Sequence, residues 1–204
     1  MNSQPKRRIW GWAIRKSSYT VILDACVLYP APLRDFLMEL AAGGLFRAKW
    51  TEQIHDEWIR NVLKNREDLK PEQLLRTKQL MNQAVPDCTV EGYEDLIEGL
   101  KLPDGDDRHV LAAAIHAACD AIITFNLKDF PRDYLAKFQI ELLHPDEFLF
   151  HQFGLNTAAV VVAAQRCRKR LKNPPRTAEE YLDTLERQGL TKTVTELRNY
   201  ASVI

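Results

Sequence analysis

The sequence lacks any long apolar run. The longest apolar stretch in its second half, residues 158–164, is far shorter than the ~20 residues that cross a bilayer. The basic N-terminus leads into Trp10 to Ile14, but Arg15 and Lys16 interrupt this segment, so no signal-peptide core follows. We therefore expect a cytoplasmic protein with no membrane segment.

The chain also lacks closely spaced cysteines. Cys26, Cys88, Cys119 and Cys167 lie far apart, whereas zinc sites commonly use paired short spacings. We favour reduced, packed thiols over zinc ligands. No internal repeat or low-complexity tract is evident, and the composition excludes a disordered tail, a collagen and a disulfide-rich miniprotein.

An excess of one charge is likewise missing, because 28 Lys and Arg balance 28 Asp and Glu. This balance conceals three regions. Residues 1–16 hold five bases and no acid, residues 17–164 hold 23 acids and 14 bases, and residues 165–204 hold nine bases and five acids. An acidic body between two basic ends predicts that any nucleic-acid contact lies at the ends.

Apolar patterns predict strands that alternate with helices. Short buried strands are expected at residues 20–23, 121–124 and 139–142. Helices are expected over residues 33–42, 51–63, 71–81 and 110–115, and from residue 156 onward the pattern is helical only. We therefore predict a basic arm (1–18), an α/β domain with a mostly parallel sheet (19–155) and an all-helical extension (156–204).

Acidic side chains gather where predicted strands end and where a predicted helix begins. They are Asp24, Glu57, Asp104, Asp106, Asp107 and Asp129. In an α/β fold these positions can converge, and carboxylates that converge can hold Mg²⁺ or Mn²⁺. Each acid also has an ordinary interpretation as a helix cap, a turn residue or a solvated helix residue. Only the joint arrangement favours a metal site.

Four segments resemble, in order, the successive motifs of PIN-domain nucleases. They are VILDACVL (21–28), TEQIHDEW (51–58), DGDDRHVLAAA (104–114) and ITFNLKDF (123–130). Within that family the chain most resembles VapC-type toxins of toxin–antitoxin pairs, including a branch with a C-terminal helical extension. The resemblance implies a three-layer α/β/α sandwich around a mostly parallel sheet.

The same resemblance implies a site. Asp24, Glu57 and Asp107 match the three main acids of the family, Asn126 matches a fourth position that is often Asp, and Asp129 matches an acid close behind it. The implied activity is RNA cleavage dependent on Mg²⁺ or Mn²⁺. Asp24, Asp107 and Glu57 would hold the cation, and Asn126 and Asp129 would support them.

Two positions depart from the family pattern. Cys26 stands where many members have Asn or Ser, which predicts the loss of a supporting hydrogen bond. Asn126 lowers the charge of the site by one, which predicts a weaker second metal position.

The implied partners are RNA (tRNA, rRNA or mRNA), a cognate antitoxin protein and a second copy of the chain. Four bases of the predicted helix after residue 156 could contact RNA phosphates, and Trp10 or Trp12 could stack on bases. The four are Arg166, Arg168, Lys169 and Arg170. The same bases could instead form a solvated helix end or contact an antitoxin segment.

Three other functions compete with the nuclease. A zinc deaminase is suggested by the HxE pattern at His55, but the PCxxC motif it requires is missing. A phosphatase with Asp24 as nucleophile usually needs a second Asp where Cys26 stands. A non-catalytic RNA-binding module would keep the basic ends without converging acids. His109 and His116 lack metal-ligand spacing, and we expect packing or surface roles for them.

Overall fold

The protein contains a small, fully parallel sheet. A computed structural model describes residues 19–204, so the predicted basic arm and its tryptophans lie outside the described residues. The strands are β1 (Thr20–Leu23), β2 (Arg47–Lys49), β3 (Ala121–Ile123) and β4 (Glu141–Leu143). They are arranged in the order β2-β1-β3-β4, and each neighbouring pair is parallel. The prediction of a mostly parallel sheet is confirmed.

The two central strands are buried along their whole length. Every residue of β1 and of β3 is buried, as expected for a parallel sheet with both faces covered. Ile22 pairs with Ile122, and the backbone N–H of Asp24 donates to the carbonyl of Ile123 at 3.1 Å. The carboxyl ends of β1 and β3 therefore lie side by side.

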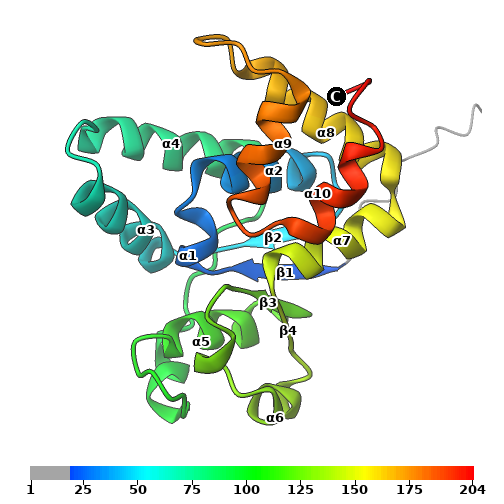
Figure 1. Cartoon of the computed structure of the whole chain (residues 1–204). Coiled ribbons are helices and arrows are strands. Elements are labelled where there is room, and N and C mark those ends of the chain that lie inside the picture. Colours follow the sequence, from blue (N-terminus) through cyan, green and yellow to red (C-terminus); the bar gives the residue numbers. More distant parts are fainter. Residues whose placement is uncertain (1–18) are drawn as a thin grey trace, which may run out of the picture.

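Helices flank the sheet (Figure 1). The first six are α1 (Ala25–Leu28), α2 (Ala31–Ala42), α3 (Glu52–Asn65), α4 (Pro71–Ala84), α5 (Arg108–His116) and α6 (Arg132–Leu135). In the view of Figure 1, α2 and α4 lie above the strands, and α5 and α6 lie below them. The core is continuous from the strands into the helices, so the predicted α/β/α fold is confirmed.

Local sequence signals set where two of the helices begin. Thr51 caps α3, because its hydroxyl accepts a hydrogen bond from the N–H of Ile54 at 3.0 Å. Pro71 occupies the first turn of α4, where its missing N–H costs nothing. These signals place α3 and α4 close to the predicted ranges.

The C-terminal helices are α7 (Pro145–Leu155), α8 (Thr157–Arg170), α9 (Ala178–Glu186) and α10 (Thr191–Arg198). Helix α8 packs against α2, and α7 packs against both α8 and α10. Asp146 of α7 is buried, and its carboxylate accepts hydrogen bonds from the N–H groups of Lys192 (2.8 Å) and Thr193 (2.9 Å). A carboxylate here satisfies donors at the start of α10, so α10 is fixed to α7.

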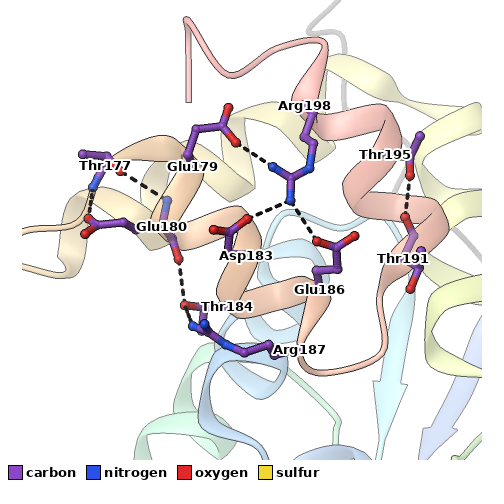
Figure 2. A network of polar contacts seen from close by, with 10 residues as sticks. All are labelled: Thr177, Glu179, Glu180, Asp183, Thr184, Glu186, Arg187, Thr191, Thr195 and Arg198. Atoms are coloured by element: carbon purple, nitrogen blue, oxygen red, sulfur yellow. Dashed lines mark hydrogen bonds and ion pairs between the residues drawn. The ribbon is translucent and has the colours of Figure 1, made fainter.

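One arginine joins α10 to α9 (Figure 2). The guanidinium of Arg198 lies 2.6 Å from Glu179, 2.8 Å from Asp183 and 2.8 Å from Glu186. All three acids belong to α9. The two helices therefore form a hairpin in which one cation joins three acids and offsets part of their charge.

The turn between α9 and α10 reaches the residues that follow β3. Gly189 has a φ of +84°, a conformation that favours glycine. A Cβ added there would lie 3.7 Å from the ring of Phe125 and 3.9 Å from that of His144. The helical extension therefore packs beside the carboxyl end of the sheet.

Several elements differ from the sequence expectations. β2, α1 and α7 were not predicted, and the last strand covers Glu141–Leu143 instead of residues 139–142. Gln139 has a φ of +59° and ends a short helical turn, which delays the strand. Within residues 19–204, no helix is both long and apolar enough to span a membrane.

Candidate active site

Asp24 lies at the carboxyl end of β1 and is 3% exposed. Its Oδ1 accepts a hydrogen bond from the N–H of Ala25 at 2.6 Å. Its Oδ2 accepts one from the Thr124 hydroxyl at 2.6 Å and one from the Cys26 thiol at 3.1 Å. A carboxylate has about four lone-pair positions, so these three donors leave about one free. Asp24 is therefore held rigidly and keeps some capacity to bind a ligand.

Thr124 is a site residue that the sequence reasoning missed. It follows β3 directly, is fully buried, and also accepts a hydrogen bond from the backbone N–H of Asn126 at 2.9 Å. The one signal in the sequence is a hydroxyl at the end of a buried strand, two residues before Asn126. Thr124 joins the ends of β1 and β3 through the Asp24 carboxylate.

Cys26 corrects one expectation. We predicted that a cysteine here would remove a supporting hydrogen bond, yet its thiol donates to Asp24 and its sulfur accepts from the N–H of Phe125 at 3.3 Å. Burial, with the nearby charge of Asp24, raises the pKa of the Cys26 thiol to about 12. The group remains a protonated donor at neutral pH. The four cysteines are free thiols, as predicted.

Asp107 precedes α5 at the N-cap position. Its side chain makes no capping hydrogen bond to the described chain, so the interpretation as an ordinary helix cap does not apply. Burial, followed by repulsion from Asp24, Asp104 and Asp129, raises its pKa from 3.8 to about 7. The structure therefore places Asp24, Asp104 and Asp129 within electrostatic reach of Asp107.

The remaining candidate side chains, before α5 and after β3, have local roles or are at least partly open to solvent. Asp104 accepts a hydrogen bond from the N–H of Asp106 at 2.9 Å, as in an ordinary turn. Asn126 is exposed, and Asp129 is half-buried in the short turn after β3. The predicted supporting roles of Asn126 and Asp129 stay predictions.

Glu57 faces the start of α5. Its Oε1 lies 2.9 Å from Nε2 of His109, which is 2% exposed, and the Glu57 side chain is 23% exposed. Glu57 is thus partly covered, which does not match a freely solvated helix residue. His109 is buried, which agrees with the packing role and not with the surface role that we expected for it.

A pocket of about 480 Å³ opens between α3 and the turn before α5. It is lined by Gln53, Asp56, Glu57, Arg60, Asn61, Asp106 and Asp107. The residues from α3 recur at helical spacing, so one polar face of that helix forms the wall. Arg60 is the one basic residue in this lining, and it places a positive charge one helical turn from Glu57.

The donor set fits a hard divalent cation in its chemistry. Carboxylate oxygens are the ligands that Mg²⁺ and Mn²⁺ prefer. Burial and neighbouring acids disfavour the ionised form of Asp107, and a bound cation would favour it. Within residues 19–204, no three Asp, Glu, His or Cys side chains already stand close enough together to hold an ion. The cation would therefore have to draw the acids closer.

The basic residues of α8 mostly have partners inside the chain. Arg166 and Arg170 lie 3.1 Å and 2.5 Å from the Glu39 carboxylate. Arg168 donates to the carbonyls of Ile204 (2.6 Å) and Arg176 (3.0 Å). Lys169 has no ion pair or hydrogen bond with the described residues. The predicted RNA contacts stay a prediction, and Lys169 is the member of the set most open to them.

Comparison with known families identifies the α/β part. The PIN domain model matches residues 20–128, more than half of the chain, and this span contains Asp24, Glu57, Asp107 and Asn126. The chain belongs to the PIN-domain family. The resemblance carried by the four motifs is therefore confirmed.

A second model, the VapC50 C-terminal domain, matches residues 145–199 of this PIN-domain protein. That match begins at α7, so the boundary that we predicted at residue 156 stays a prediction. A relative from Mycobacterium tuberculosis (strain ATCC 25618 / H37Rv), named "Putative ribonuclease VapC50", is 41% identical over 97 residues. The aligned segment covers 48% of this chain and 57% of the relative's length. No solved structure matches the chain.

Proposed function

We propose that the protein is an endoribonuclease that hydrolyses RNA phosphodiester bonds with the help of Mg²⁺ or Mn²⁺. The observation that carries this proposal is that Asp24 and Asp129, which come from two other segments, lie within electrostatic reach of Asp107. No lysine or arginine within residues 19–204 forms an ion pair with any of them. A fold that gathers uncompensated carboxylates in this way has a use for an external cation.

Asp24, Asp107 and Glu57 would hold the cation. When bound, a divalent ion lowers the pKa of a water molecule and offsets negative charge on the phosphate. Thr124 and Cys26 keep the Asp24 carboxylate in one orientation through their hydrogen bonds. Glu57 completes the ligand set or orients the attacking water, and Asn126 and Asp129 support the site from the turn after β3.

Basic residues must offset the repulsion between an acidic site and RNA. Arg60 lines the pocket beside Glu57, and Lys169 is open to solvent. Each phosphate contact of this kind contributes about −0.7 to the salt-dependence slope for single-stranded RNA. The N-terminal bases are further candidates on the basis of the sequence.

The family relationships support a toxin of a toxin–antitoxin pair. The matching relative is named a ribonuclease, and the chain carries the C-terminal domain of that relative's type. We infer a cytoplasmic protein that cleaves tRNA, rRNA or mRNA, binds a cognate antitoxin and forms a homodimer.

The Asp-nucleophile phosphatase is less consistent with the geometry. Such a nucleophile usually works with a second Asp two residues on, whereas Cys26 stands there and its thiol donates to Asp24. A non-catalytic RNA-binding module is the remaining alternative, and a test of RNA cleavage distinguishes it from the nuclease.

Asp24→Asn is the decisive variant, because it keeps the shape of the side chain and removes its charge. Induced expression in a bacterial host, with total RNA mapped for new ends, should show growth arrest and cleavage with the wild type and neither with Asp24→Asn. Asp133→Asn is the matched control, since Asp133 is exposed on α6. RNA binding without new ends in the wild type would favour the RNA-binding module.

A further inference from the structure

His109 is a buried polar side chain whose hydrogen bonding is incomplete. It lies in the first turn of α5, and its side chain is 2% exposed. Neither ring nitrogen makes a hydrogen bond of good geometry with the described residues. Nε2 nevertheless lies 2.9 Å from Oε1 of Glu57. Buried polar groups are usually satisfied, so this ring needs an explanation.

A second buried histidine shows what a structural role looks like in this protein. His55 is fully buried, its Nε2 lies 3.0 Å from Oδ1 of Asn82, and its Nδ1 accepts from the indole N–H of Trp58 at 2.9 Å. Both nitrogens of His55 are thus satisfied within the core. In contrast, neither nitrogen of His109 makes a hydrogen bond of good geometry with the described residues, and the side chain that lies 2.9 Å from its Nε2 is Glu57, a predicted site residue.

We propose that His109 is a positioning residue for Glu57. Nε2, 2.9 Å from Oε1 of Glu57, would donate to that oxygen after a small reorientation of the ring, and the second carboxylate oxygen would remain for the cation or its water. This inference rests on the proposed function, because it assigns the orientation of a residue of that site.

The need for such a residue follows from the flexibility of glutamate. Glu57 stands on the polar face of α3, and several bonds of its side chain rotate freely in solution. Asp24 is held by three hydrogen bonds, whereas Glu57 has none from the described backbone. Groups that orient the ligands of a metal commonly change metal affinity or activity 10- to 100-fold when they are removed.

The test compares two variants of His109. His109→Leu keeps much of the volume but removes the donor, and His109→Gln keeps an N–H that can reach Glu57. We expect His109→Leu to weaken Mn²⁺ binding and to lower kcat, each about 10- to 100-fold, with a smaller change in KM. His109→Gln should recover most of both. His116→Leu, at the exposed other end of α5, is the matched control.

The readouts separate this inference from the proposed function. Mn²⁺ affinity is measured by electron paramagnetic resonance without turnover, and ¹⁵N chemical shifts of the imidazole report its tautomer. The Nε2–H tautomer in the wild type, altered in Glu57→Gln, supports the contact even if His109→Leu does not fold. Unchanged Mn²⁺ affinity and kcat in folded His109→Leu overturn the inference alone. A wild type that neither binds Mn²⁺ nor cleaves RNA overturns both.

Discussion

Two acidic groups in this protein are built in opposite ways. On α9, Glu179, Asp183 and Glu186 surround the guanidinium of Arg198 at 2.6–2.8 Å (Figure 2). At the end of the sheet, burial and then the charges of Asp24, Asp104 and Asp129 raise the pKa of Asp107, and no arginine or lysine of the described chain forms an ion pair with these four acids. In the first group, one guanidinium offsets part of the charge of three carboxylates. In the second, no cationic side chain of the described chain does so, which leaves that role to a proton or an external cation.

Removing divalent cations should have the largest effect, because it acts on the group that lacks an internal cation. RNA cleavage should fall to the level of Asp24→Asn in EDTA and return with excess Mn²⁺ or Mg²⁺. Mn²⁺ at 100 times its dissociation constant should also stabilise the fold by ~2.7 kcal/mol. Cleavage assays and thermal melts measure both effects. Cleavage that persists in EDTA would show that the acids at the end of the sheet need no divalent cation.

Asp107→Asn should stabilise the metal-free protein at high pH. The pKa of Asp107 is about 7 in the folded state against 3.8 ordinarily, so the folded state binds the proton more tightly. The wild type therefore loses stability as pH rises from about 4 to about 7, whereas the variant does not. Melts in a chelating buffer should show a higher Tm for the variant at pH 8 and a small difference at pH 4.

Asp133→Asn is the control for this pH series, since Asp133 is an exposed acid outside the pocket. Its Tm difference from the wild type should not change with pH. An Asp107→Asn variant that is less stable than the wild type at pH 8 would show that the carboxylate is already compensated.

Arg198→Gln tests the acidic group of α9, which has an internal cation. The change leaves three acids of α9 beside one another, and a partly exposed network of this kind contributes about 1 kcal/mol. We expect Tm to fall by about 2–4 °C, with cleavage unchanged. Arg187→Gln is the control, because the side chain of Arg187 makes one hydrogen bond to the described residues, to the Thr184 hydroxyl at 3.0 Å. Equal effects of the two variants would mean that the network adds nothing to stability.

Lys169→Glu should have the smallest effect, on RNA affinity alone. Lys169 has no internal partner in the described chain, whereas Arg166 and Arg170 pair with Glu39. The salt slope of binding should fall by about 0.7 if Lys169 contacts one phosphate. Lys192→Glu, an exposed lysine elsewhere in the extension, should leave it unchanged. An unaltered salt dependence of RNA binding in Lys169→Glu would show that Lys169 of α8 does not contact an RNA phosphate.

The sequence predicted those parts of the fold whose signals are local. β1 and β3 are short runs of apolar, mostly β-branched residues, and both are buried throughout. β2 escaped prediction because Arg47 and Lys49 flank a single buried alanine. Only its pairing with β1 identifies it as a strand.

The site was predictable to a similar extent. Asp24 and Asp107 stand at element boundaries, so their convergence followed from the fold class, although its geometry did not. Thr124 and His109 carried no comparable signal, because their importance depends on which carboxylate packs against each of them. The pairing of Arg170 with Glu39 joins residues 131 positions apart, which no local pattern could show.

The turn at Gly189 limits how the C-terminal helices could be exchanged between related proteins. A side chain at that position would touch Phe125 and His144, so the extension and the α/β domain are shaped to fit one another there. Helices α7 to α10 also share one hydrophobic core with the α/β domain, so the equivalent piece of another PIN-domain protein would have to reproduce these contacts. The two parts therefore have to be exchanged together with the surface around Phe125.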